Sequence, residues 1–327
     1  MAGRASVEDR LHFVERLREE GNLAALRAGL TKALGDHSNL VVAEAARIIA
    51  ELELSGFEPT LLAAWQRMLV DPIKSDKGCT AKTAIIEALG RLNHDDPDFF
   101  LAGMKYHQVE PAWPSSEETA ANVRGNCAFS LARSRQFRIV DKLVAFVDLM
   151  QDSSRMSRVY AAQAIADTGQ DEAIPVLRLK LLLGDAEPEV LGACMSGLLK
   201  LVPATSIPLV VRFLTSHNED VRLEAAAALG ECGRAEAVDA LLDRLRSTHE
   251  GDLRRPLIIS IGLSREPKAV RFLISLVEAG EQDAEVALEA LRPGCVYHDL
   301  RECVRTAVQK TGNNKLIGLF ERKLGRE

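Results

Sequence analysis

The sequence predicts an all-α fold, a right-handed α-solenoid of about eight helix pairs with capping helices at both ends. Three observations support this prediction. A motif of small and apolar residues recurs along the chain, aromatic residues make up only 5% of it, and Pro and Gly stand where helices are expected to begin and end. One helix pair cannot bury its own apolar face, so a recurring pair is typical of units stacked in series.

The clearest helix pair lies at 218–247, "NEDVRLEAAAALGECGRAEAVDALLDRLRS". Its first helix carries Val221, Ala225 and Leu229 on one face, at helical spacing. Gly233 is predicted to end this helix, because glycine is favoured just after a helix terminus. The following "AEAVDALLDRL" predicts a second amphipathic helix.

The same spacing recurs in seven other segments. In each, small or apolar residues stand four and five positions after an anchor residue, and in most also eight positions after it. The eight anchors are Val41, Ala81, Val123, Ser157, Val190, Val221, Leu253 and Val286. Successive anchors lie 31 to 42 residues apart. A helix pair repeated over this many copies predicts a solenoid.

The 218–245 pattern resembles HEAT repeats, specifically the short type found in phycobilisome-lyase-like proteins. The resemblance extends over roughly residues 40–310, most of the chain. It implies that the "VR" helix lines a concave face and the "AVDALL" helix a convex one. The family includes scaffolds, enzyme-regulating subunits and chromophore lyases, so the resemblance implies the fold without selecting one function.

The chain is predicted to form a single α-solenoid domain over 1–327. Its three parts are an N-terminal cap and half repeat (1–36), the repeats (37–295) and C-terminal cap helices (296–327). Prolines in "FEP", "DDP" and "AEP" are predicted to begin helices, where their missing N–H is tolerated. Asp96, before Pro97, is predicted to cap one of them.

The longest interval, from Ala81 to Val123, predicts an inserted loop near 105–116, because turns between helices need only about 2–8 residues. The insertion carries Tyr106 and His107 at its start. Long ordered loops on a rigid scaffold often carry function, which makes it a candidate for partner binding.

A structural interpretation of the insertion is also open. In it, Trp113 packs into a neighbouring groove while Pro111 and Pro114 stiffen the chain, since aromatic residues commonly serve as packing anchors. This interpretation is the preferred one for Trp113. The loop is then an ordered edge element beside the binding surface.

A basic run at 121–140 contains four arginines and no acid. Four arginines along the chain follow an anchor directly, which predicts a ladder of arginines paired with loop carboxylates. They are Arg124, Arg158, Arg222 and Arg254. Arg133, near Phe129, stands later in its helix and suits an acidic or phosphate-bearing partner. The alternative for Arg133 is a solvated helix end.

The cysteines predict no metal site. Cys127 and Cys194 occupy repeat positions that hold Ala or other apolar residues elsewhere, and so are expected to be small core residues. Cys295, His298 and Cys303 form a Cys/His cluster, but no fourth ligand follows at zinc spacing.

Composition restricts the remaining functions. A formal charge of −6 argues against a general nucleic-acid binder. No apolar run reaches the ~18 residues of a membrane span, and no secretion signal is evident, which predicts a cytoplasmic protein. Motifs for dinucleotide, phosphate-loop, zinc-protease and nucleophile-elbow chemistry are missing, so no cofactor is expected.

The function predicted from these features is a non-enzymatic scaffold or adaptor that binds a protein partner on its concave face. The candidate partner-binding residues are Tyr106, His107, Trp113, Phe129, Arg133 and Tyr160. The alternative is an enzyme or enzyme subunit on the same scaffold, either chromophore-lyase-like or a nucleic-acid binder resembling DNA-alkylation glycosylases. The oligomeric state is left open.

Overall fold

The computed structural model describes residues 6–248 and 253–324, and the chain forms two compact units, residues 1–173 and 174–327. The helices of the first unit are α1 (Val7–Arg16), α2 (Leu23–Leu34), α3 (Asn39–Glu51), α4 (Glu58–Met68), α5 (Pro72–Ser75), α6 (Thr80–Arg91), α7 (Pro97–Met104), α8 (Ala121–Arg133), α9 (Ile139–Leu149) and α10 (Arg155–Asp167). Between α7 and α8 the chain forms a hairpin of two strands, β1 (Val109–Pro111) and β2 (Ser116–Glu118).

The second unit begins within α11. Its helices are α11 (Ala173–Leu183), α12 (Pro188–Leu201), α13 (Pro203–Val211), α14 (Glu219–Glu231), α15 (Ala235–Arg246), α16 (Arg254–Leu263), α17 (Pro267–Ala279), α18 (Ala284–Leu291), α19 (His298–Lys310) and α20 (Asn314–Lys323). Short 3₁₀ turns, Arg212–Thr215 and Arg292–Val296, follow α13 and α18. The prediction of helix pairs throughout is therefore confirmed for the part of the chain that the structure describes.

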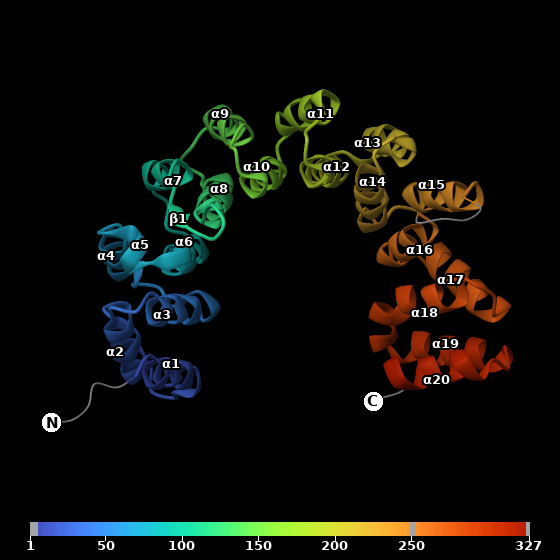
Figure 1. Ribbon diagram of the computed structural model, residues 1–327, viewed down its shortest axis with the longest axis horizontal. Helices are drawn as coiled ribbons and strands as arrows, with labels where there is room; N and C mark the ends of the chain where they lie inside the picture. The colour runs from blue at the N-terminus through green and yellow to red at the C-terminus, as the bar shows by residue number, and fades with distance from the viewer. Residues whose placement is uncertain (1–5, 249–252, 325–327) are drawn as a thin grey trace. The chain divides into compact units, whose positions relative to one another are not determined.

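The first unit has two layers of helices. Helices α3, α6, α8 and α10 pack on one another in sequence and form the layer that we call the inner layer (Figure 1). Helices α2, α4, α7 and α9 form the outer layer, each packed on an inner helix. This alternation of inner and outer helices is the helix-pair arrangement predicted from the repeat spacing.

The second unit repeats the arrangement. Helices α12, α14, α16 and α18 pack in sequence, α13, α15 and α17 pack beside them, α19 packs on α17, and α20 packs against α18 and α19. Within the described residues of both units, no helix combines the length and apolar composition needed to cross a membrane. The division into an N-terminal cap, repeats and C-terminal cap helices remains a prediction, and its outermost residues, 1–5 and 325–327, lie outside those described.

The repeat spacing correctly identifies the core. In all eight segments the residues four and five positions after the anchor are buried, and both predicted core cysteines, Cys127 and Cys194, are among them. Burial raises the pKa of both thiols, that of Cys194 to about 12. Small side chains allow close helix approach. A Cβ added to Gly230 would collide with the backbone carbonyl of Ser260 on the next inner helix.

Helix boundaries follow the predicted signals. The Asp96 carboxylate accepts from the backbone N–H of Phe99 at 3.1 Å and caps α7. Helix α14 ends at Glu231, and Gly233 follows with φ +62°, a conformation that glycine adopts without strain.

The predicted pairing of these arginines with loop carboxylates is confirmed for one arginine in each unit. Arg124 contacts the carboxylates of Glu118 and Asp152, and Arg254 contacts the carboxylate of Asp283. Two further arginines donate to backbone carbonyls of the preceding loop. Arg158 donates to the carbonyl oxygen of Asp152, and Arg222 donates to that of Ser216. Each cation therefore ties the start of an inner helix to a loop that precedes an inner helix.

Lys82 occupies the same position in its repeat as Arg124. It and Asp76 are fully buried, and the Lys82 Nζ lies 3.0 Å from an Asp76 carboxylate oxygen. The same carboxylate accepts from the backbone N–H groups of Ala81 and Lys82, both at 2.9 Å, and so caps α6. Removing one partner of such a pair leaves a buried charge without a counter-charge, which destabilises the fold.

We expect Asp76→Ala to lower the free energy of unfolding by roughly 3–5 kcal/mol, because Lys82 loses its counter-charge and α6 its cap. Urea unfolding followed by circular dichroism measures this change. The control is Asp243→Ala, which removes the exposed partner of Arg246 at 2.8 Å from helix α15 and should leave the unfolding midpoint nearly unchanged. Equal effects of the two substitutions would contradict a buried pair.

Candidate functional site

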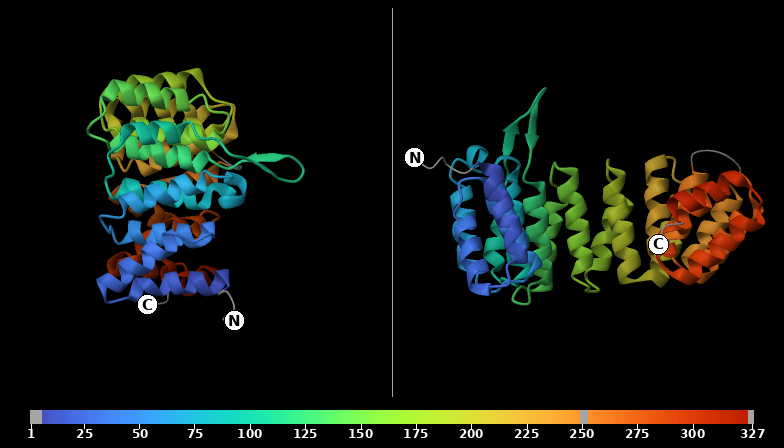
Figure 2. Two further views of the ribbon diagram at one scale, coloured as in Figure 1. Left: turned by 90° about the vertical axis from the view of Figure 1, so that its left-hand side faces the viewer. Right: turned by 90° about the horizontal axis from the view of Figure 1, so that it is seen from below.

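The insertion between α7 and α8 is a β-hairpin, which we call the arm (residues 108–119). Its strands pair antiparallel, with Glu110 opposite Glu117, and it extends beyond the ends of the neighbouring helices (Figure 2). Trp113 lies near its tip with 95% of its surface exposed. The prediction that Trp113 anchors a loop in a groove is therefore wrong, because the turn between the strands leaves its ring exposed to solvent. The sequence also gave no indication of strands here.

A buried carboxylate holds the base of the arm. Glu110 is only 4% exposed, and one of its oxygens accepts three hydrogen bonds. The donors are the Gly78 backbone N–H at 2.6 Å, the Gln108 amide at 2.7 Å and the Thr119 hydroxyl at 2.9 Å. Burial raises the pKa of Glu110, but these three donors outweigh it and leave the pKa below its ordinary value.

A second carboxylate joins the arm to α8. Glu118 receives two bonds from the fully buried guanidinium of Arg124, at 2.9 and 2.8 Å, and one from the backbone N–H of Ala120 at 3.0 Å. Burial acts to raise the pKa of Glu118, but Arg124 and the backbone donors lower it on balance. The arm is therefore fixed at its base by charge-assisted hydrogen bonds, while its tip is free of them.

Tyr106 and His107 lie where α7 leads into the arm. The Tyr106 ring packs edge-on against Trp65, at 6.0 Å between ring centres, and its hydroxyl donates to Gln108 at 2.7 Å. Burial raises the pKa of Tyr106 to about 12, so the phenol stays protonated. His107 is half exposed, and its Nδ1 accepts from Arg124 at 3.2 Å. Tyr106 is thus mainly a packing residue, whereas His107 reaches solvent.

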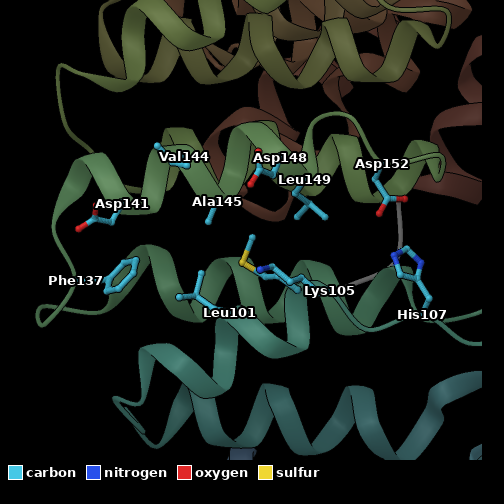
Figure 3. A pocket seen from close by; sticks show the side chains of 11 residues that line it. Leu101, Lys105, His107, Phe137, Asp141, Val144, Ala145, Asp148, Leu149 and Asp152 are labelled. Atoms are coloured by element: carbon cyan, nitrogen blue, oxygen red, sulfur yellow. The ribbon is translucent and has the colours of Figure 1, made fainter.

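A groove of about 380 Å³ separates the outer helices α7 and α9 (Figure 3). Its floor is apolar, formed by Leu101, Met104, Phe137, Val144 and Leu149. Polar side chains also line it. His107 and Asp152 lie at the end next to the arm, Lys105 and Asp148 lie along its middle, and Asp141 lies at the other end. Sequence inspection did not identify this groove, because its two walls come from different repeats.

The other predicted residues lie on the inner layer. Phe129 of α8 and Tyr160 of α10 are half buried and pack edge-to-face, with ring centres 5.7 Å apart. The Tyr160 hydroxyl donates to Asn122 at 2.8 Å. Arg133 is exposed and lines, with Phe129, a polar groove of about 610 Å³ between α6 and α8. We call Phe129, Arg133 and Tyr160 the inner patch.

The six predicted residues therefore occupy three places rather than one. Phe129, Arg133 and Tyr160 share the inner layer, Tyr106 and His107 lie at the base of the arm, and Trp113 lies at its tip. Sequence reasoning missed the buried polar residues at the base of the arm, which are Asp76, Lys82, Gln108 and Glu110, and the part-buried Glu118. Lys82 carried a usable signal, since it follows an anchor as Arg124 does.

The Cys/His cluster does not assemble as a metal site among the described residues, where no three His, Cys, Asp or Glu side chains lie close enough to hold an ion. Cys295 is buried and Cys303 is exposed, on either side of the start of α19.

Comparison with known proteins identifies the repeats. Residues 177–262, within the second unit, match the family model described as HEAT repeats. This segment consists of HEAT repeats. The match confirms the resemblance predicted from the 218–245 pattern, and the HEAT segment contains the complete helix pair α14–α15.

Several solved structures are similar to the chain. YibA of Escherichia coli shares 17% identity, with 96% of this chain and 100% of that chain covered and a TM-score of 0.42. An engineered protein shares 17% identity, with coverage of 97% and 94% and a TM-score of 0.35. The complex of CpcE and CpcF of phycocyanin lyase from Nostoc sp. PCC7120 shares 16%, with coverage of 82% and 94% and a TM-score of 0.37. No curated protein matches the chain.

The lowered pKa of Glu110 predicts a pH-dependent contribution to stability. A carboxylate whose pKa is lower in the folded than in the unfolded state stabilises the folded state. This stabilisation is complete above the pKa of the unfolded state, about 4.3, and is lost as pH falls through the pKa of the folded state. We expect Glu110→Gln to lower the free energy of unfolding by roughly 1–2 kcal/mol at pH 7. The difference in this free energy between the variant and wild type should become smaller as pH falls below about 4.

Urea unfolding at a series of pH values measures this gap. Glu117→Gln is the matched control, since it lies directly opposite in the hairpin and is exposed. A gap for Glu110→Gln that stays constant from pH 7 to about 3 would show that the charge of Glu110 does not hold the arm.

Proposed function

We propose that this protein is a non-enzymatic scaffold that captures a protein partner on the inner patch of its first unit. The observation that carries the proposal is the Phe129–Tyr160 pair, two aromatic rings that pack together and stay partly exposed on the inner layer. Half-exposed aromatic residues beside an arginine are the side chains most enriched at binding hot spots.

The charges of the polar groove next to the pair favour a protein partner rather than a nucleic acid. Arg91 and Arg133 line it together with Glu87 and Glu53, so the groove carries both positive and negative charges. Nucleic-acid grooves instead concentrate positive charge, because affinity arises from phosphate neutralisation. Mixed charge around aromatic anchors suits the polar rim of a protein interface.

The side chains of the patch suit binding better than chemistry. Burial raises the pKa of Tyr160, whose hydroxyl donates to Asn122, so the phenol is neither a ready base nor a nucleophile at neutral pH. A glycosylase-like site would need Trp and Asp together in a basic groove. Trp65 instead packs against Phe99 and Tyr106, and Trp113 lies on the arm.

We expect the triple variant Phe129→Ala, Arg133→Ala, Tyr160→Ala to recover its specific partners at least ~10-fold less efficiently than wild type, since a tenfold loss of affinity needs only about 1.4 kcal/mol and one hot-spot truncation costs about 2 kcal/mol or more. The measurement is affinity capture from a lysate of the source cells, with quantitative mass spectrometry of the retained proteins. Cross-linking then locates the contact on the chain.

The control variant is Leu23→Ala with Val70→Ala, which removes exposed apolar side chains outside the inner patch. It should retain the same proteins as wild type. Equal recovery by wild type and the triple variant would place the binding surface elsewhere.

A further inference from the structure

We propose that the partner segment bound at the inner patch carries a phosphorylated serine or threonine, and that Arg133 and Arg135 bind its phosphate group. This inference rests on the proposed function, since it names the chemistry of the partner that the inner patch binds. It starts from the basic run at 121–140, which contains four arginines. Arg124 and Arg138 of this run pair with carboxylates of the chain, whereas Arg133 and Arg135 line one groove.

This groove has a volume of about 360 Å³ and lies where α6 and α8 end; we call it the arginine groove. Arg133 and Arg135 line it from the end of α8, and Asn93 and His94 line it from the turn after α6. It shares four lining residues, Arg133 among them, with the polar groove beside Phe129. The two grooves are therefore continuous, and a segment bound at the inner patch can place one side chain in the arginine groove.

The two guanidinium groups of this groove are available to a ligand. Arg133 and Arg135 are both exposed, and neither forms an ion pair or a side-chain hydrogen bond with any residue that the structure describes. Arg138, in the same loop, instead donates twice to the carboxylate of Asp141, at 2.7 and 2.9 Å. The fold thus supplies a counter-charge to one arginine of the loop and none to the other two.

Asp95, the acid that lines the arginine groove, already has partners. Its carboxylate accepts from the Ser134 hydroxyl at 2.5 Å. The carboxylate also acts on buried Lys142: burial lowers the pKa of Lys142, and the charge of Asp95 opposes this shift. The Lys142 ammonium donates to the carbonyls of Ala132 and Ser134 at the end of α8. It thereby offsets the negative end of the helix dipole, which would otherwise disfavour an anion there.

The donors of the arginine groove suit a phosphate monoester better than a carboxylate. One guanidinium can satisfy both oxygens of a carboxylate, whereas a phosphate monoester has three acceptor oxygens and a charge of about −1.5 to −2 at pH 7. Arg133, Arg135 and Asn93 together offer donors for three oxygens. A nucleic acid needs positive charge along a whole track of phosphates, but the continuing groove carries Glu53 and Glu87.

The spacing of the site predicts a sequence preference in the bound segment. Phe129 and Arg133 both belong to α8 and line the same groove, four residues apart. This separation is one helical turn, ~6 Å along the axis at about 1.5 Å per residue. An extended peptide covers this distance in about two residues. We therefore expect an apolar or aromatic residue about two positions from the phosphorylated one.

Retention of peptide libraries by the purified full chain tests the proposal. One library has a fixed phosphoserine between random flanking residues, and two matched libraries have serine or glutamate at that position. The chain should retain the phosphoserine library at least ~10-fold better than either of the others, since only the phosphate uses both arginines. Sequencing of the retained peptides should show the apolar or aromatic residue about two positions away.

Substitutions then locate the site on the chain. Arg135→Gln should lower retention of the phosphoserine library at least ~10-fold, because it removes one charged donor of the groove. Arg138→Gln is the matched control, since Arg138 belongs to the same loop, has an 81% exposed side chain and does not line the groove. Phe129→Ala with Tyr160→Ala should remove the apolar preference and keep the preference for phosphoserine. Circular dichroism confirms that each variant keeps its helical content.

Inorganic phosphate probes the arginine groove without any peptide. Added at constant pH and ionic strength, it should shift the NMR signals of the His94 ring, which lines the groove. The signals are assigned with His94→Gln, and those of exposed His298 in the second unit should not move. In Arg135→Gln the same shift of His94 should need at least ~10-fold more phosphate.

Equal retention of the three libraries overturns the proposal, as does retention of the phosphoserine library that Arg135→Gln leaves unchanged. Stronger retention of a mixed-sequence single-stranded oligonucleotide than of the phosphoserine library would assign the groove to nucleic acid and also overturn it. A His94 ring that does not respond to phosphate contradicts it as well.

Failure of the proposed function gives a different result. The phosphoserine library then still binds through Arg135, which supports the phosphate site, but substitution of Phe129 and Tyr160 changes neither its sequence preference nor the capture of partners. Conversely, capture that needs Phe129 and Tyr160 but survives both Arg135→Gln and phosphatase treatment of the lysate supports the proposed function and overturns the phosphate inference.

Discussion

The guanidinium group of Arg124 is fully buried and joins three segments of the first unit. It donates to Glu118 of the arm, to Asp152 before α10 and to the carbonyl of Tyr106 after α7. A buried cation is tolerated only when its donors are satisfied, so these segments are obliged to converge on it. The base of the arm, the arm-side end of the groove and the start of α8 are all positioned by this one side chain.

The same constraint recurs wherever inner helices stack closely. Small residues bring successive inner helices so near that their first turns, with unpaired backbone groups, lie against the preceding loops. A Lys or Arg directly after the anchor residue of a repeat pairs with the polar groups of these loops by binding their carboxylates or carbonyls. Lys82 does this in the first unit and Arg254 in the second. The apolar repeat and the ladder of cations are therefore two parts of one packing solution.

The inner patch and the arm lie on different parts of the first unit. The proposed inner patch is built on α8 and α10, with aromatic rings bordered by mixed charge. The arm and the apolar groove lie at the outer helices α7 and α9. Because the two regions share no residue, a substitution in one can be tested without altering the other.

The sequence by itself determined which residues are buried in each repeat, because helical periodicity acts over a few residues and is visible in one segment at a time. It also determined the arginine ladder, the α7 cap and the position of the insertion. Only the tertiary structure decided that the insertion forms strands, that Glu110 is buried and that Trp113 is not. Glu110 is held by Gly78, 32 residues earlier, and a contact of that range exists only after α6 and the arm have come together. Trp113 lies in the turn between the two strands and is 95% exposed, so no contact of that range buries it.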